Sequence, residues 1–219
     1  MTILDGKNVS AQVKERVKFE ALNLKNQGIE PALAVILVGE DKASQTYVAA
    51  KEKACNLCEI KSVMHRLSES TTQSELIELI DVLNLDDGID GILVQLPLPK
   101  HIDTNKILET ISPAKDVDGF AAINVGKLAS GLDGFVPCTP LGIMEIFKAY
   151  DINLEGKNAV VIGRSNIVGK PMANLLLNAN ATVTVTHSKT RNLKEICAEA
   201  DILVAAIGRA DFVTADMVK

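Results

Sequence analysis

An uninterrupted apolar run from Ala32 to Val38 does most to limit the folds open to this chain. The run is closed by Gly39 and contains no polar position, so it does not match a sheet with one face in water. It predicts a strand buried on both faces. Such strands occur mainly in parallel sheets that are covered by helices.

Strand and helix patterns alternate along the rest of the sequence. Predicted strands follow at 61–67, 91–96, 157–163, 181–186 and 201–207, and predicted helices lie at 43–57, 72–83, 141–150 and 171–177. This alternation is typical of α/β proteins with parallel sheets. The pattern changes near Pro137-Cys-Thr-Pro140, so we expect two domains, residues 1–138 and residues 139–219.

Composition excludes several classes of protein. The 219 residues include 23 basic and 28 acidic side chains, a net charge of −5, and only 3% aromatic residues. A nucleic-acid-binding protein more often has a concentrated basic patch with aromatic side chains, so we expect no nucleic-acid partner. No apolar run reaches the roughly 20 residues that span a bilayer, and the first residues lack a secretory signal pattern. We therefore expect a cytoplasmic protein with no membrane partner.

The four cysteines are consistent with reduced thiols in the cytoplasm. Cys55 and Cys58 have the spacing of a redox or zinc pair, but no second pair follows and they sit on a predicted helix. The three histidines are scattered without ligand spacing. We expect no metal site.

The segment Gly163-Arg-Ser-Asn-Ile-Val-Gly169 lies between a predicted strand and a predicted helix. A glycine at the strand end lets the backbone turn tightly toward a pyrophosphate, whose charge is favoured at a helix N-terminus. Ser165 replaces the usual central glycine, and a tight turn that binds nothing is the alternative. The order of strand, loop, helix and strand favours a dinucleotide site.

The end of the next strand indicates which dinucleotide would bind. An NAD site normally has an acid about 20 residues past the glycines, which bonds the ribose 2′-hydroxyl. Here the stretch is His187-Ser-Lys-Thr-Arg191, with no acid and two fixed positive charges. Hydroxyl and cationic groups accept a 2′-phosphate, and Arg164 is a further candidate partner. The sequence favours NADP, with a solvated basic turn as the alternative.

Tyr47 and Lys51 are four residues apart on a predicted helix, so both leave the same face. Such a pair suits general acid–base chemistry, although an amphipathic helix bordered by a lysine is the commoner explanation. Short-chain dehydrogenases also contain Tyr-x-x-x-Lys, but there the nucleotide loop precedes the pair. Here the loop follows the pair, so we reject that class.

Two further polar features lie before the domain boundary. Gln95 stands at the end of an apolar strand, where side chains of parallel sheets commonly face a ligand. Lys115-Asp-Val-Asp118-Gly-Phe120 places two acids in a loop, which by itself is also typical of a solvated turn.

Taken together, these motifs resemble the bifunctional methylenetetrahydrofolate dehydrogenase/methenyltetrahydrofolate cyclohydrolase family. The motifs in the family's order are Ser44-x-x-Tyr-Val-x-x-Lys51, Asn84-x-Asp86, Ile92-Leu-Val-Gln-Leu-Pro-Leu-Pro99, Lys115-Asp-Val-Asp-Gly-Phe120, Pro137-Cys-Thr-Pro140 and Gly163-Arg-Ser-Asn-Ile-Val-Gly-Lys-Pro171. The resemblance extends from about residue 5 to the end of the sequence.

The resemblance implies an α/β protein with an amino-terminal three-layer catalytic domain that binds folate and a Rossmann-type domain that binds NADP. It also implies a function in one-carbon metabolism and a homodimer. The expected reactions are oxidation of 5,10-methylenetetrahydrofolate with NADP and hydrolysis of the methenyl product to 10-formyltetrahydrofolate. Family members continue with a further strand and closing helix, so the resemblance implies that the NADP domain is incomplete in this chain.

The same resemblance implies roles for individual residues. Lys51 is the expected catalytic lysine, Tyr47 stacks near the pterin, and Gln95 orients Lys51. Asp118 is expected to hydrogen-bond the pterin ring. The implied cofactor-binding residues are Gly163, Arg164 and Ser165 at the phosphates and Ser188 near the 2′-phosphate.

Two other functions remain open from the residues. One is a folate- or nucleotide-binding module without catalysis. The other is an NADP reductase of the shikimate-dehydrogenase type, which accounts for the Gly163 loop but not for the motifs around Gln95 and Asp118.

Overall fold

A computed structural model describes residues 2–219 and divides them into two units. The amino-terminal unit comprises residues 5–122, and the carboxyl-terminal unit comprises residues 123–219 together with residues 2–4. Within residues 2–219, no helix is long and apolar enough to cross a membrane.

The amino-terminal unit contains a three-stranded parallel sheet in the order β2-β1-β3. Its strands are β1 (Ala32–Val38), β2 (Lys61–Leu67) and β3 (Gly91–Val94), and its helices are α1 (Gly6–Asn26), α2 (Lys42–Leu57), α3 (Gln73–Leu85) and α4 (Thr104–Thr110). Ala34 pairs in register with Val63 on one side and Ile92 on the other. The central strand β1 is therefore the buried strand that the apolar run predicts.

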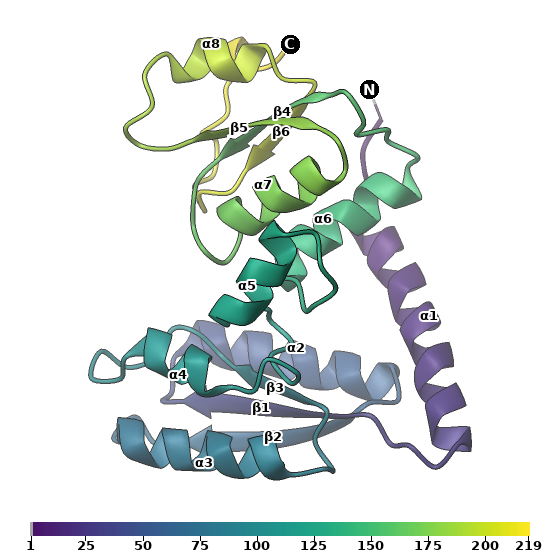
Figure 1. Cartoon of the computed structure of the whole chain (residues 1–219), viewed down its shortest axis with the longest axis vertical. Helices are drawn as coiled ribbons and strands as arrows, with labels where there is room; N and C mark the ends of the chain where they lie inside the picture. Colours follow the sequence, from purple (N-terminus) through teal and green to yellow (C-terminus); the bar gives the residue numbers. More distant parts are fainter. Residues whose placement is uncertain (1) are drawn as a thin grey trace. The chain divides into compact units, whose positions relative to one another are not determined.

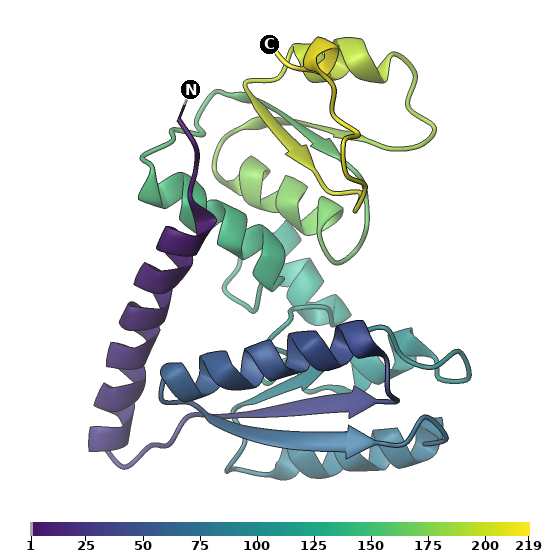
Figure 2. The same ribbon diagram turned by 180° about the vertical axis from the view of Figure 1, so that it is seen from behind.

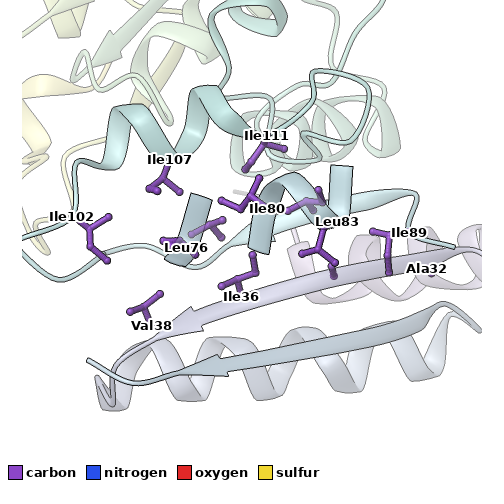
Figure 3. Close-up of a cluster of buried hydrophobic side chains, with 13 residues drawn as sticks. Ala32, Ile36, Val38, Leu76, Ile80, Leu83, Ile89, Ile102, Ile107 and Ile111 are labelled. Carbon is purple, nitrogen blue, oxygen red and sulfur yellow. The ribbon is translucent and has the colours of Figure 1, made fainter. Parts of the chain in front are cut away.

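Helices cover both faces of this sheet, with α2 and α3 on opposite sides (Figures 1 and 2). Alternate residues of β1, such as Ile36, pack with Leu76 and Ile80 of α3 and Ile107 of α4 in the larger core (Figure 3). The intervening residues Val35 and Leu37 pack with Val48 of α2. The period-two alternation of a strand thus supplies two separate cores, and the unit has three layers.

Side-chain caps define where the covering helices begin. The Asp41 carboxylate accepts a hydrogen bond from the Ser44 N–H at 2.8 Å and caps α2. Thr72 and Glu75 form a capping box at the start of α3. These bonds satisfy N–H groups that have no partner within the helix.

The carboxyl-terminal unit repeats this arrangement with the strand order β5-β4-β6, again parallel. Its strands are β4 (Asn158–Ile162), β5 (Thr182–Thr186) and β6 (Ile202–Ala205). Its helices are α5 (Ala122–Ala129), α6 (Cys138–Ala149), α7 (Gly169–Asn178), α8 (Leu193–Ala198) and the short 3-10 helix η1 (Ala215–Met217). Val161 packs with Met172 and Leu176 of α7, whereas Val160 packs on the side of Cys197 in α8.

The structure confirms the predicted α/β class and the strands at 32–38 and 61–67. The predicted strand 91–96 is shorter in the structure: β3 ends at Val94, and the chain bends at Leu96, which is joined to Pro97 by a cis peptide bond. The predicted helix 141–150 begins earlier, at Cys138. Pro140 fits its first turn, where the N–H that proline lacks would have no intrahelical partner.

Candidate functional site

Both sheets place a topological switch point beside their central strand. From β1 the chain crosses to β2 on one side, and it later returns to β3 on the other side. The same holds for β4, which lies between β5 and β6. Ligands of open α/β sheets bind at the carboxyl ends of strands where the connections diverge. The residues that follow β1, β3, β4 and β6 are therefore the candidates for a site.

Lys51 and Gln95 meet at the first of these points. Lys51 lies on α2, and its Nζ donates to Gln95 Oε1 at 3.1 Å. Gln95 directly follows β3, and its main-chain N–H still bonds Ile36 O at 2.8 Å. Its Nε2 donates to Leu96 O at 2.7 Å, which leaves Oε1 directed at the lysine. The amide is thus held from two sides while it accepts from Lys51.

Tyr47 lies one helical turn before Lys51 and is the one aromatic residue of α2. Its side chain is 64% exposed, whereas Ser44 and Val48 on the inner face of the helix are buried. An exposed ring beside a partly buried lysine provides an apolar face on which a flat ring can stack.

The acidic loop after α4 lies beside β3. Ile92 forms a parallel bridge with Asp116, and the Ile92 N–H donates to Lys115 O at 2.7 Å. The Asp116 carboxylate is only 1% exposed and accepts from the Ala121 N–H at 2.9 Å. Asp118 is half-buried two residues later. Of the two acids, Asp116 therefore shapes the loop, and Asp118 is the more accessible one.

The glycine loop of the carboxyl-terminal unit is closely packed. Gly163 has φ of 116°, and a Cβ there would overlap Ala206 O after β6. A Cβ on Gly169, the first residue of α7, would overlap Gly163 O. Both glycines are therefore required for the tight turn between β4 and α7, and that turn brings the loop to the second switch point.

Ser165 takes part in the same turn. Its hydroxyl accepts hydrogen bonds from the N–H groups of Val168 and Gly169, at 3.2 and 3.3 Å. Its main-chain carbonyl accepts from Lys170 N at 3.0 Å. Ser165 thus stabilises the loop from within, and the neighbouring Arg164 is exposed.

The turn after β5 exposes Ser188 and its two basic residues, whereas the Thr190 hydroxyl stabilises the turn. The His187 N–H donates to Thr190 Oγ1 at 2.8 Å, and the Lys189 N–H donates to His187 Nδ1 at 3.1 Å. Ser188, Lys189 and Arg191 are exposed. A helix N-terminus, an exposed Arg164 and a basic turn without an acid fit a dinucleotide that carries an additional phosphate.

The predicted site residues of the amino-terminal unit differ in how directly the structure connects them. Lys51 and Gln95 are in contact, and Tyr47 shares α2 with Lys51. Asp118 belongs to the segment paired with β3. The sequence did not predict a role for Asp116. Its burial and its bond from the Ala121 N–H, which are visible only in the structure, mark it as the acid that shapes the loop. Within residues 2–219, no group of three or more histidine, cysteine or acidic side chains is arranged to hold a metal ion.

The fold and these residues define a class of enzyme, in which one α/β unit presents a lysine–amide pair and another presents a dinucleotide loop. Family models agree: "Tetrahydrofolate dehydrogenase/cyclohydrolase, catalytic domain" matches residues 4–118, and the corresponding "NAD(P)-binding domain" matches residues 137–219. The chain belongs to the tetrahydrofolate dehydrogenase/cyclohydrolase family. This result confirms the predicted family and its paired activities, and it excludes a reductase of the shikimate-dehydrogenase type.

Individual relatives are very similar over the whole chain. "Bifunctional protein FolD" of Campylobacter concisus is 75% identical over 219 residues, which are 100% of this chain and 77% of the relative. The protein of the same name from Campylobacter fetus is 73% identical over 218 residues, with the same coverage.

Solved structures show the same similarity. The bifunctional enzyme from Campylobacter jejuni has a TM-score of 0.98 at 57% identity, over 100% of this chain and 78% of that one. The Trypanosoma brucei enzyme, described as complexed with NADP cofactor and inhibitor, has a TM-score of 0.94 at 36% identity, over 100% and 75%.

Proposed function

We propose that this protein oxidises 5,10-methylenetetrahydrofolate with NADP and hydrolyses the methenyl product to 10-formyltetrahydrofolate, using Lys51, Tyr47, Gln95 and Asp118. The observation that carries the assignment of residues is the hydrogen bond between Lys51 Nζ and Gln95 Oε1 at the switch point. Tyr47 supplies a stacking surface near the pterin, and Asp118 accepts hydrogen bonds from the pterin.

Hydrolysis needs two proton transfers. The attacking water loses a proton, and the folate nitrogen that leaves the methenyl carbon gains one. Neutral Lys51 accepts the first proton and, as an ammonium, donates one to the nitrogen. A neutral amide suits this exchange because it orients the lysine without adding the negative charge by which a carboxylate would favour the ammonium form.

The oxidation makes smaller demands on the protein. NADP, when bound, accepts the hydride from the methylene carbon. The lone pairs of the two flanking folate nitrogens stabilise the cation that remains, so this step needs orientation rather than a base. Gly163, Arg164 and Ser165 hold the cofactor's phosphates in this proposal, and Ser188 lies near the 2′-phosphate. The basic turn after β5 and the NADP complex of the Trypanosoma brucei relative support NADP over NAD.

The remaining expectations belong to the same proposal. We assign residues 1–138 to the folate-binding catalytic domain and residues 139–219 to the NADP-binding domain. We further propose a cytoplasmic homodimer that binds no nucleic acid. The dispersed charge supports the last point, because it forms no concentrated basic patch in the sequence.

The loss of methenyltetrahydrofolate absorbance tests the hydrolytic assignment. We expect the wild-type protein to exceed the buffer rate, Lys51→Met to fall to it, and the exposed Lys53→Met on the same helix to match the wild type. Reduction of NADP is measured on the same proteins, and Lys51→Met should retain part of it. Equal loss of both activities in Lys51→Met would contradict this division of roles. Binding without turnover in the wild type would indicate a non-catalytic module.

A further inference from the structure

Lys115 connects the acidic loop to the end of a helix about 30 residues earlier in the chain. Its Nζ donates to Leu83 O at 3.0 Å and to Asp86 O at 2.7 Å. Both carbonyls belong to the C-terminal end of α3, whose last turn contains no basic residue. The last carbonyls of a helix lack intrahelical partners and favour a positive charge. Lys115 supplies both the charge and the donors from outside the helix.

The side chain of Asn84 also connects this helix to the residues that precede Lys115. Asn84, in the last turn of α3, donates from Nδ2 to Thr110 O at 2.8 Å. Its Oδ1 accepts from the Ser112 N–H at 2.8 Å. The Lys115 N–H in turn donates to Ser112 O at 2.8 Å. The chain from residue 110 to residue 115 is thus bonded at several points to the end of α3.

The main chain of Lys115 then joins this segment to β3. Its carbonyl accepts from Ile92 N at 2.7 Å and from Val117 N at 3.0 Å. Gly91 lies so close to Val117 that a Cβ there would overlap the valine side chain. Because the bridge between Ile92 and Asp116 is parallel, the residues after Asp116 run in the same direction as β3, which leads to Gln95.

We propose that Lys115 is a positioning residue for Asp118. Its two bonds to α3 fix the point from which the acidic loop leaves the sheet, and they thereby hold the Asp118 carboxylate where it meets the pterin. This proposal rests on the proposed function, in which Asp118 binds folate. Lys115 acts through the loop rather than on the substrate, because its Nζ is engaged by two main-chain carbonyls.

Steady-state hydrolysis of methenyltetrahydrofolate by the whole chain tests the proposal. Lys115→Met removes both donors and keeps the length of the side chain, and Lys115→Arg retains donors for both carbonyls. Lys100→Met, an exposed lysine of the same unit, is the matched control. We expect Lys115→Met to raise KM about tenfold with less than about a threefold fall in kcat, since a displaced carboxylate weakens binding more than chemistry. Lys115→Arg should restore most of the KM.

A double-mutant cycle with Asp118→Asn separates positioning from a general loss of structure. If Lys115 acts through Asp118, Lys115→Met should change KM less than about twofold in the Asp118→Asn background. Equal effects in both backgrounds, or a fall in kcat without a change in KM, would overturn the proposal. Should Lys115→Met melt below the assay temperature, Lys115→Gln takes its place in the cycle.

If the proposed function itself is wrong, the result differs from a failure of the Lys115 proposal: the wild type shows no hydrolysis, or Lys51→Met retains hydrolysis. The affinity for tetrahydrofolate, measured on the same set of proteins, then decides the Lys115 proposal by the same cycle with Kd in place of KM.

Discussion

Lys51 Nζ and Gln95 Oε1 are 3.1 Å apart, although 44 residues separate them in the sequence. The amide oxygen faces the lysine because Gln95 Nε2 is bonded to Leu96 O and the Gln95 main chain to Ile36 O. Three secondary-structure elements, α2, β1 and β3, therefore contribute to one hydrogen bond.

Replacement of Gln95 should affect hydrolysis in two distinct ways. Gln95→Leu removes the acceptor, so we expect the hydrolytic kcat to fall about 10- to 100-fold as Lys51 loses its orientation. Gln95→Glu keeps an acceptor for Lys51 but adds a negative charge beside it, so its hydrolytic kcat should lie between those of wild type and Gln95→Leu. Steady-state hydrolysis of methenyltetrahydrofolate by the three proteins measures both effects. An unchanged kcat in Gln95→Leu would contradict this role.

Ser188 should control the choice of cofactor. Ser188→Asp places a carboxylate where we propose the 2′-phosphate lies, and it should weaken NADP binding about 100-fold while changing NAD binding less than about threefold. Arg164→Ala should also weaken NADP binding more than NAD binding. Isothermal titration calorimetry with each dinucleotide gives the two dissociation constants, and Lys148→Ala on the exposed side of α6 is the control. An equal loss of affinity for NADP and NAD would count against the assignment.

Because of Asp41, the free energy of unfolding should decrease as the pH falls into the acid range. Two hydrogen bonds lower the pKa of Asp41 below its ordinary value of 3.8. The one from the Ser44 N–H has the larger effect, and the one from the Ser44 hydroxyl has the smaller. The ionised carboxylate is thus favoured by folding, so its contribution is present above pH 3.8 and is lost as the pH falls through the lower, folded-state pKa.

The comparison with Asp41→Asn isolates this effect, because asparagine caps a helix without titrating. We expect the difference in urea midpoint between wild type and Asp41→Asn to stay constant above about pH 5. Toward about pH 3, the midpoint of the wild type should fall relative to that of Asp41→Asn. A difference that is the same at both ends of this range would show that the cap does not depend on ionisation.

The cysteines should differ strongly in reactivity. Burial raises the pKa of the Cys55 and Cys197 thiols, whereas Cys138 is exposed at the start of α6. Iodoacetamide at about pH 8 should modify Cys138 at least about tenfold faster than Cys55 or Cys197, because only an accessible thiolate reacts. Peptide mass mapping over time measures the three rates, and Cys138→Ser should abolish the fast phase. Rapid labelling of Cys55 in the native protein would contradict its burial.

Two strands of the amino-terminal sheet could be predicted from the sequence to the residue. Ala32–Val38 and Lys61–Leu67 form β1 and β2 as expected, and the buried central strand β1 has the clearer signal because its apolar run ends sharply at Gly39. β3 ends two residues before the predicted end: Gln95 still donates its main-chain N–H to Ile36 O, but Gln95 and Leu96 are not part of the strand although the residues around them are apolar.

Several helices gave no clear signal. No helix was predicted over α1, although Val9, Val13, Val17 and Ala21 are spaced four apart on one of its faces; only Val9 and Ala21 of these are buried. α4, α5 and α8 have seven, eight and six residues, too short for a period of about 3.6 to stand out. Their positions depend on tertiary contacts, such as that of Ile107 with the core of the amino-terminal unit (Figure 3).

The types of site residue were predictable, but their partners were not. The motifs pointed to Lys51 and Gln95, yet their contact depends on the sheet order that places β3 beside β1. The cap of α2 likewise depends on a specific partner, since the Asp41 carboxylate accepts from the Ser44 N–H. Lys115 gave no local signal, because its two acceptors are main-chain carbonyls 32 and 29 residues earlier in the chain.

The strand order β2-β1-β3 recurs as β5-β4-β6, and each sheet has cores of its own. Lys51, Gln95 and Asp118 are anchored to the first sheet, whereas the residues from Gly163 to Ser188 are anchored to the second. The proposed cofactor-binding residues and the proposed hydrolytic residues therefore lie in separate stretches of the sequence. Under this proposal, an exchange of the turn at residues 187–191 should change the preference between NADP and NAD and leave the contact between Lys51 and Gln95 intact.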